Sequence, residues 1–529
     1  MMQSAKQKHR VLGHILWIFS IGLCIFFLAC GRMPDAKGGS FLSAASPGKG
    51  AAKNIILMLA DGSGFNTFAA ASCYEHGEPG KEVFNAFPVK YASYTQSADA
   101  DGRVRPYSAE SFWKDFGYAK TSYTDSAAAA TALFTGVKTY DRAISVGIDF
   151  KPLKTIFEIA HESGRSSGVV TTSTLYDASP ACAAAHSKSR LNYADISSQM
   201  ILGSTLDVIM GCGDPDRADP KAASNQSVKT PFDYVGGEST WEALKAGSAG
   251  GNNPWTLIRS KEAFTALAAG TDAPRRVIGI PAGGADAQQD RPGDLMADAF
   301  VVPMRPDVPT LATMTTGALN VLAKNPKGFC LMIEGGSIDH AAHYNRKGRL
   351  IEEQVDFNEA VRTAVAWVES RSSWDETLLI VTVDHETGNV WGPNSGKTSE
   401  TPFNPVACNG KGKMPLFRFH SGNHTNTLVP VYAKGAGAAV FAQMVRDHDP
   451  VYGPYIDNTD VFSVMNAAIT GKKPVAKKPI EPAVPSRRQP AAQWVQSPGL
   501  RPFHGQVPLA LDLLFLSACS AYTPGIVKP

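Results

Sequence analysis

The sequence predicts an α/β fold built around a large, mostly parallel β-sheet. From Lys53 to about Gly471, apolar runs of strand length alternate with amphipathic helical patterns, and this alternation is typical of βαβ units. The stretch from Leu350 to Ser370 shows the helical pattern, because Val361 and Val365 fall on one face. Several of the apolar runs also stop at a carboxylate, which is expected of parallel strands that deliver functional side chains to one edge of a sheet.

Four apolar runs end at or shortly before an acid. The runs and their acids are Asn54 to Ala60 with Asp61, Gly168 to Thr172 with Asp177, Gly328 to Ile333 with Glu334, and Thr377 to Val383 with Asp384. If these runs are buried parallel strands, the acids meet in the crevice where open α/β sheets bind ligands. Clustered carboxylates, with Asp339 as a fifth, repel one another unless cations fill the crevice. The sequence therefore predicts a metalloenzyme.

The N-terminus has the order of an export signal. Lys6, Lys8 and Arg10 precede the apolar run Val11 to Ala29, and small residues follow. The segment around Cys30 resembles a lipoprotein cleavage site, which makes Cys30 a candidate for lipidation and membrane anchoring. The alternative is an uncleaved membrane anchor, because a span needs about 20 apolar residues. We expect an exported protein of the periplasm or a cell-envelope lipoprotein.

The composition indicates one large domain with flanking segments. We expect a signal at 1–30, a flexible tether at 31–52, a catalytic domain at 53–470, a Pro-rich linker at 471–500 and a tail of unknown role at 501–529. Within the domain, stretches rich in Gly, Asn, Asp and Pro predict loop-rich insertions at about 211–309 and 389–422. A formal net charge of +3 gives no sign of a nucleic-acid surface, so small molecules are the expected partners.

Local features of one strand and of the cysteines add three expectations. The run from Leu428 to Gly435 contains Pro430, which predicts an edge strand. Cys330 lies within a predicted buried strand and is expected to be an inert core thiol. The six cysteines beyond the signal lack C-x-x-C spacing, which argues against a structural zinc ribbon and leaves the disulfide pairing open.

The segment from Thr124 to Gly136 predicts a helix that begins near Ser126. It has a polar start, an alanine-rich body and a terminal glycine. A hydroxyl at this position faces unpaired backbone N–H groups and the positive end of the helix dipole, which suits a nucleophilic alkoxide and a phosphate group. The alternative is that Asp125 and Ser126 only cap the helix.

Histidines and further acids follow the strand ends at spacings that suit metal ligands. Asp339 and His343 are four residues apart, which places two side chains on one helical face. His385 directly follows Asp384, and His424 precedes another apolar run. Any of these residues alone could belong to an ordinary polar loop. Their convergence at strand ends favours a metal site.

Six motifs, in order along the chain, resemble those of the alkaline phosphatase family. They are Asp61-Gly62-Ser63-Gly64, Thr124 to Ala129, Asp177-Ala178-Ser179-Pro180, Glu334 to His343, Asp384-His385 and His424-Thr425. The resemblance covers roughly residues 53 to 470. It implies a three-layer α/β/α fold, and a homodimer that hydrolyses phosphate monoesters to an alcohol and inorganic phosphate.

The resemblance also implies two zinc ions and one magnesium ion. One zinc is bound by Asp339, His343 and His424, and the second by Asp61, Asp384 and His385. Magnesium is bound by Asp61, Asp177, Ser179 and Glu334, so that Asp61 bridges two metals. Ser126 is implied as the nucleophile that forms a phosphoserine, and Arg190 as the phosphate-binding arginine.

The chain departs from the common family pattern at a few positions. Ser179 stands where threonine is frequent, and His340 follows Asp339 where lysine is frequent, a change that could alter phosphate affinity. Two alternatives to a monoesterase remain open. One is a related hydrolase, such as a phosphodiesterase or phosphonate hydrolase. The other is a lipoprotein that binds phosphate or metal without catalysis.

Overall fold

The computed structural model describes residues 52–217, 230–271, 273–397 and 402–474. Its core is an eleven-stranded sheet with the strand order β12-β13-β2-β11-β8-β1-β7-β3-β4-β6-β5. These strands are β1 (Asn54–Leu59), β2 (Val89–Tyr94), β3 (Ser166–Thr174), β4 (Val208–Cys212), β5 (Thr256–Ile258), β6 (Val277–Gly279), β7 (Phe329–Glu334), β8 (Thr377–Thr382), β11 (Val429–Gly435), β12 (Asp447–Asp449) and β13 (Gly453–Asp457). A separate antiparallel pair joins β9 (Glu386–Thr387) to β10 (His424–Thr425).

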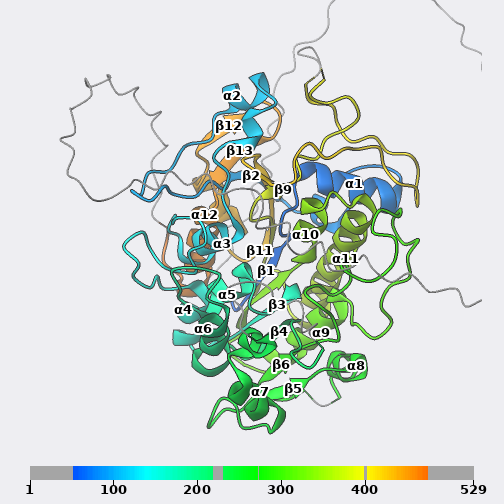
Figure 1. Cartoon of the computed structure of the whole chain (residues 1–529). Coiled ribbons are helices and arrows are strands. Elements are labelled where there is room, and N and C mark those ends of the chain that lie inside the picture. The colour runs from blue at the N-terminus through cyan, green and yellow to red at the C-terminus, as the bar shows by residue number, and fades with distance from the viewer. Residues whose placement is uncertain (1–51, 218–229, 272, 398–401, 475–529) are drawn as a thin grey trace, which may run out of the picture. The chain divides into compact units, whose positions relative to one another are not determined.

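Helices cover both faces of this sheet. The α-helices of the described residues are α1 (Phe65–His76), α2 (Ala109–Lys114), α3 (Ser126–Thr135), α4 (Ile156–Glu162), α5 (Ala178–Ala184), α6 (Tyr193–Ser198), α7 (Glu238–Lys245), α8 (Lys261–Ala269), α9 (Leu311–Leu322), α10 (Ser337–His343), α11 (Lys347–Arg371) and α12 (Thr459–Thr470). Figure 1 shows α9, α10 and α11 on one side of the central strands and α3, α4, α5 and α6 on the other.

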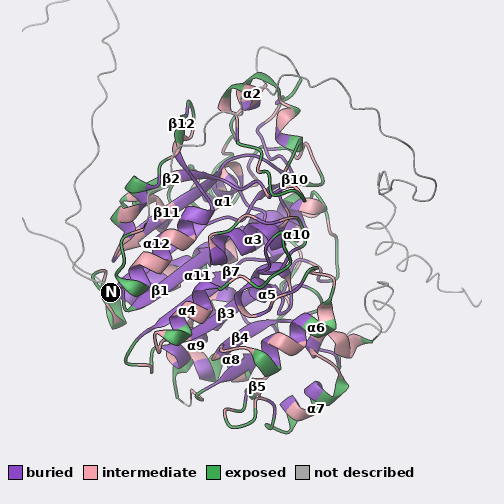
Figure 2. Ribbon diagram, turned by 90° about the vertical axis from the view of Figure 1, so that its left-hand side faces the viewer, coloured by how far each residue is buried: buried purple, intermediate pink, exposed green. Residues whose placement is uncertain are grey.

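The alternation of side chains along β1 explains the three layers. Ile55 and Leu57 belong to the apolar cluster that contains α3, α4, α5 and α12, whereas Ile56 and Met58 belong to the cluster that contains α1, α9, α10 and α11. All four side chains are fully buried, as the buried colour of the central strands in Figure 2 illustrates. A strand buried on both faces reads as a continuous apolar run. The three-layer α/β/α fold with a mostly parallel sheet is therefore confirmed.

The four strands that end at acids lie side by side in the middle of the sheet. Strand β1 pairs in parallel with β7 and β8, and β7 pairs in parallel with β3. In this register, Leu59 lies opposite both Glu334 and Thr382. The carboxyl ends of the four strands therefore meet at the same edge, and the acids that follow them are brought together.

The prediction that Pro430 marks an edge strand is wrong. Strand β11 lies inside the sheet and pairs antiparallel with both β2 and β8. The residues of β11 that pair with β8 are Tyr432 to Gly435 only. Pro430 lies outside this pairing, so its missing backbone N–H costs no hydrogen bond to β8. Thr382 Oγ1 donates a hydrogen bond of 3.1 Å to the Pro430 carbonyl there.

The segment expected as a loop-rich insertion at 211–309 also extends the sheet. Its three-residue strands β5 and β6 pair in parallel and continue the sheet beyond β4. Strands this short leave no long apolar run in the sequence. The segment expected at 389–422 is joined to α1 by a disulfide between Cys73 and Cys408.

Several expectations concern residues outside the described ranges. The signal at 1–30 with Cys30, nearly all of the tether, most of the linker and the tail at 501–529 lie outside them. Among the described residues, no helix is both long and apolar enough to cross a membrane. Helix α11 confirms the helix expected at 350–370, with Val361 and Val365 buried.

Candidate metal centre

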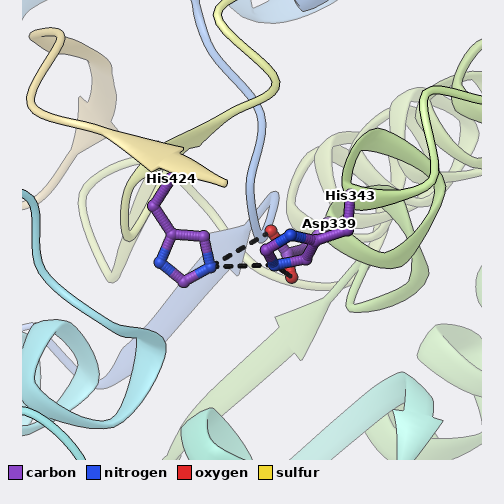
Figure 3. Close-up of side chains that lie close together, drawn as sticks. All are labelled: Asp339, His343 and His424. Carbon is purple, nitrogen blue, oxygen red and sulfur yellow. Dashed lines mark hydrogen bonds and ion pairs between the residues drawn. The ribbon is translucent and has the colours of Figure 1, made fainter. Parts of the chain in front are cut away.

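Asp339, His343 and His424 form the first of two groups of ligands at the carboxyl edge. Figure 3 shows His424 from β10 and His343 from α10 facing each other, with Asp339 beside them. The Nε2 atoms of the two histidines are 3.0 Å apart, and Asp339 Oδ2 lies 3.2 Å from His343 Nε2. The spacing of Asp339 and His343 along one helix face produces this approach, as the sequence predicts.

Backbone carbonyls fix the orientation of both imidazoles. His343 Nδ1 lies 2.8 Å from the Gly422 carbonyl oxygen, and His424 Nδ1 lies 2.8 Å from the Thr124 carbonyl oxygen. A carbonyl can only accept, so each Nδ1 carries a proton and each neutral ring directs a lone pair from Nε2 toward the other. Two facing lone pairs beside a carboxylate need a cation between them, either a proton on His343 or a metal ion. This is the outer-shell arrangement of metal-binding histidines.

Asp61, Asp384 and His385 form the second group, and all three are buried. Backbone N–H groups of Gly62 and His385 donate to Asp384 Oδ1 at 3.1 and 2.8 Å, which leaves Oδ2 turned to His385 Nε2 at 3.1 Å. Asp61 Oδ1 is buried and accepts no hydrogen bond from the described residues. Burial, and after it the nearby Asp384 and Asp339, raise the pKa of Asp61.

His385 cannot neutralise these acids with a proton. Burial, together with the neighbouring His424, lowers the pKa of His385 well below its usual range. The two rings are stacked with centroids 3.6 Å apart. With a neutral imidazole, the second group offers one nitrogen and two carboxyl oxygens to a ligand. That donor set suits a divalent ion such as zinc.

Gly62 allows the two groups to approach each other. Its φ is +68°, and a Cβ atom there would lie 2.4 Å from Asp339 Oδ1. Any other residue would therefore push the loop that carries Asp61 away from Asp339. The glycine of the first motif has a steric reason to stand at this position.

A third group has oxygen donors only. Glu334 Oε2 accepts a hydrogen bond of 2.6 Å from Thr171 Oγ1, whereas Glu334 Oε1 and Ser179 Oγ are buried atoms without a hydrogen-bond partner in the described ranges. Burial raises the pKa of Glu334 to about 7. Asp177 precedes α5 and interacts electrostatically with Asp61. An all-oxygen set is the kind that magnesium prefers.

Ser126 lies where the sequence predicts, at the first turn of α3. Its Oγ is 3.1 Å from His385 Nε2. Asp125 caps the helix, because its Oδ1 accepts a hydrogen bond of 3.0 Å from the Ala128 N–H. The Ser126 hydroxyl is therefore available to the second ligand group.

Arg190 lies on the other side of the Ser126 turn. Its Nη1 is 3.3 Å from Asp125 Oδ2, and its Nη2 is 2.8 Å from Asp177 Oδ1. The guanidinium is thus held between the N-cap of the helix that carries Ser126 and the acid at the end of β3. Such a fork suits two oxygens of a phosphate group.

Asp286 is a site residue that the sequence reasoning missed. Its Oδ1 lies 2.6 Å from His340 Nδ1 and accepts a hydrogen bond of 2.8 Å from Ser337 Oγ. His340 Nε2 in turn lies 3.8 Å from Asp177 Oδ2. Asp286 stands in the Gly- and Ala-rich segment between β6 and α9, where no local pattern distinguishes it.

All eleven side chains singled out in the sequence lie at this one edge of the sheet. Acids and imidazoles arranged for divalent ions, next to a helix-terminal serine and an arginine, define a metal-dependent hydrolase.

Comparison with known proteins gives the family. The sequence model of the alkaline phosphatase family matches residues 52–448, so the chain belongs to that family. The chain is 31% identical over 445 residues to the alkaline phosphatase of Escherichia coli K12, covering 79% of this chain and 86% of the relative. It is 32% identical over 448 residues to alkaline phosphatase H of Pseudomonas aeruginosa, covering 79% and 85%.

Solved structures agree with this membership. The alkaline phosphatase of the Antarctic bacterium TAB5 matches with a TM-score of 0.54 and 25% identity, covering 79% of this chain and 98% of that chain. The Thermus thermophilus alkaline phosphatase has the same fold, with a TM-score of 0.55, 21% identity and coverage of 83% and 96%. The protein is therefore a metal-dependent phosphomonoester hydrolase.

Proposed function

We propose that this enzyme hydrolyses phosphate monoesters through a phosphoserine on Ser126, at a site for two zinc ions and one magnesium ion. The observation that carries the proposal is the contact of 3.1 Å between Ser126 Oγ and His385 Nε2, at the N-terminus of a buried helix and beside Arg190. It joins a nucleophile, a ligand group and an anion site in one place.

The donor atoms fit the three ions. Asp339, His343 and His424 would hold one zinc, and Asp61, Asp384 and His385 the other, since both sets combine imidazole nitrogen with carboxylate oxygen. The oxygen-only set of Asp61, Asp177, Ser179 and Glu334 would hold magnesium. When bound, the ions would lower the pKa of the serine hydroxyl and of water, and offset charge on the leaving oxygen.

The charges fit a dianionic substrate. Three divalent ions would exceed the charge of the five carboxylates by one, and Arg190 adds one more positive charge. A phosphate monoester carries close to two negative charges near pH 7, because its second pKa is about 6. The site then approaches neutrality with substrate bound, which favours a monoester over a singly charged diester.

The residues of the chain divide the reaction into two displacements. Ser126 Oγ loses its proton to solvent and attacks phosphorus, so that an Oγ–P bond forms while the bond to the ester oxygen breaks in line. The released alkoxide takes a proton from water and leaves as the alcohol. Water then attacks the phosphoserine from the vacated side, the Oγ–P bond breaks, and Ser126 regains its proton. Arg190 holds two phosphate oxygens throughout, and the positive end of α3 stabilises charge near Oγ.

The test is Ser126→Ala, assayed for phosphate release and for trapping of phosphoenzyme. We expect both to be lost. Ser260→Ala is a matched control, because Ser260 caps α8 far along the chain and its Oγ accepts from Ala263 N–H. Undiminished turnover in Ser126→Ala would rule out this serine as the nucleophile. Elemental analysis of the purified protein tests the ion content independently.

A phosphodiesterase or phosphonate hydrolase is the second candidate. The complete oxygen-only group at Glu334 and Ser179 favours the monoester. Rates on a nitrophenyl monoester and on the matching diester separate the two, and a faster diester rate would reverse the assignment. A binding lipoprotein without catalysis is excluded if the purified protein, reloaded with zinc and magnesium, releases phosphate.

Three properties of the whole chain belong to the proposal as well. We propose export to the periplasm or cell envelope, lipidation at Cys30 and assembly as a homodimer. Palmitate labelling should disappear in Cys30→Ser, and the mass of the protein in solution should equal two chains. Labelling that persists in the variant would rule out lipidation at Cys30. A mass equal to one chain would rule out the homodimer.

A further inference from the structure

A cavity of about 380 Å³ lies beside the proposed catalytic centre and takes no part in binding the phosphate group. It is lined by the segment that follows β2 and by the turns before and after α3. Its wall is shared with the site at two points. The Tyr123 ring meets the His424 ring edge-on, with centroids 6.0 Å apart. Asp141 Oδ1 accepts a hydrogen bond of 3.3 Å from the Asp125 N–H.

The cavity lies on the side where the alcohol of the ester would point. In an in-line displacement, the leaving oxygen is opposite the attacking atom. Ser126 Oγ approaches from the side of His385, and the group that contains His424 is the one that remains for the ester oxygen. Because Tyr123 packs against His424, an alcohol that extends from the ester oxygen past His424 meets the wall of the cavity.

The lining has the chemistry of a site for a neutral ring with several hydroxyl groups. Tyr123 and Tyr140 contribute aromatic rings to the lining, and Asp99 and Asp141 contribute carboxyl groups. Arg105 is largely exposed, and its Nη1 donates to Ser122 Oγ at 2.7 Å while its Nε lies 3.6 Å from Asp99 Oδ2. Aromatic faces with hydrogen-bonding groups at the rim are what a sugar ring needs.

The charge of the lining excludes a second anionic group. Two carboxylates outnumber the single guanidinium, so an additional phosphate or carboxylate on the alcohol would be repelled. A long alkyl chain would bury the carboxylates without giving them partners. A sugar hydroxyl carries no negative charge, and it can donate hydrogen bonds to the carboxylates.

Given the proposed phosphomonoesterase reaction, on which this inference rests, we propose that the cavity binds the sugar ring of the leaving alcohol. The enzyme then prefers sugar phosphates and nucleoside monophosphates to simple alkyl phosphates. Asp99 and Tyr140 determine this specificity, Asp99 by accepting from ring hydroxyls and Tyr140 by packing against the ring.

The experiment compares kcat/KM for ribose 5-phosphate, adenosine 5′-phosphate and n-butyl phosphate. In the wild type, both sugar esters should exceed butyl phosphate. In Tyr140→Leu and in Asp99→Asn, the ratio of ribose 5-phosphate to butyl phosphate should fall about tenfold, which corresponds to about 1.4 kcal/mol.

Two control variants match these changes. Tyr140→Phe also loses the hydrogen bond of the Tyr140 hydroxyl to the Lys188 carbonyl but keeps the ring, so its ratio should stay within about twofold of the wild type. Asp101→Asn removes a neighbouring carboxylate that pairs with Arg103 and does not line the cavity. It should leave kcat/KM unchanged for both ribose 5-phosphate and butyl phosphate.

The outcomes separate the inference from the proposed reaction. If the ratio of kcat/KM for ribose 5-phosphate to that for butyl phosphate is the same in the wild type and in the two cavity variants, the sugar site is overturned. The proposed monoesterase reaction is not affected by that result. No phosphate release from any of the three esters overturns the proposed reaction instead. A fall with both sugar esters identifies the ribose ring as the recognised group and supports the cavity as its site. A fall with adenosine 5′-phosphate alone assigns the recognition to the base and overturns the sugar site.

Discussion

The carboxylates at the sheet edge and the carboxylate of Glu352 in α11 are both buried, but their charges are balanced differently. Glu352 is 2% exposed and contacts two buried arginines, Arg291 at 2.9 Å and Arg349 at 3.1 Å. It also accepts a hydrogen bond of 2.6 Å from the Phe300 N–H. Asp61 is 6% exposed, and the one basic side chain within ion-pair distance of it in the described ranges is His385, at 3.8 Å.

The difference shows where the chain has left room for ions. At Glu352 the protein supplies its own positive charge, so the group is complete and has a structural role. At the sheet edge, Arg190 reaches Asp177, but no lysine or arginine of the described ranges lies within ion-pair distance of Asp61 or Asp384. A buried carboxylate without a cation costs several kcal/mol, so this cluster is stable only with bound ions or protons.

The largest expected effect is the loss of activity in Asp61→Asn, because we propose that Asp61 binds two of the ions. We expect kcat/KM to fall by about 10³-fold or more. The free energy of unfolding in the presence of a chelator should not fall, since the substitution removes a charge that has no partner. A variant with wild-type activity would show that Asp61 is not a ligand.

Arg291→Met should reduce the free energy of unfolding and leave activity unchanged, the opposite of Asp61→Asn. It leaves Glu352 with one cation instead of two, and breaking a buried ion pair typically costs about 3–5 kcal/mol. Denaturant unfolding measures this loss, and activity per folded molecule should stay near that of the wild type. The contrast between the two regions fails if Arg291→Met reduces activity as strongly as Asp61→Asn does.

Removal of metal should destabilise the wild type by a smaller amount at each site. At a free ion concentration of 100 times the dissociation constant, the ions contribute about 2.7 kcal/mol per site. Thermal unfolding with and without a chelator should show this shift in the wild type and in Arg291→Met. Asp61→Asn should show a smaller shift. Equal shifts in all three proteins would place the stabilising ions elsewhere.

Loss of a surface ion pair should have the smallest effect on stability among these variants. Lys154 Nζ lies 2.6 Å from Glu162 Oε2, and both side chains are more than half exposed. Lys154→Ala should change the free energy of unfolding by at most about 1 kcal/mol, because solvent screens the pair. A larger loss would mean that burial does not explain the difference between the other variants.

Local sequence patterns were sufficient to predict much of the site. The apolar runs before Asp61, Glu334 and Asp384 identify strands because each run is buried on both faces. The spacing of Asp339 and His343 is a property of one helix, and so is the position of Ser126 behind its capping Asp125. Each of these features depends on residues only a few positions apart, which is why the chain alone reveals them.

Features that depend on distant contacts could not be predicted in the same way. Asp286 becomes a site residue only because the fold brings it to His340, 54 positions later. The disulfide between Cys73 and Cys408 closes 335 positions, and no spacing rule identifies such a pair. Pro430 suggested an edge strand, because the sequence does not show that β8 stops short of it.

The sequence by itself determined the strand-end acids, the spacing of Asp339 and His343 and the helix that begins at Ser126, since these follow from the periods of strands and helices. The tertiary structure alone decided which imidazole nitrogens face each other, which acids lack a cationic partner, and where a cavity adjoins the site. The physical reason is that lone pairs, counter-charges and cavities arise between elements, whose packing no local period specifies.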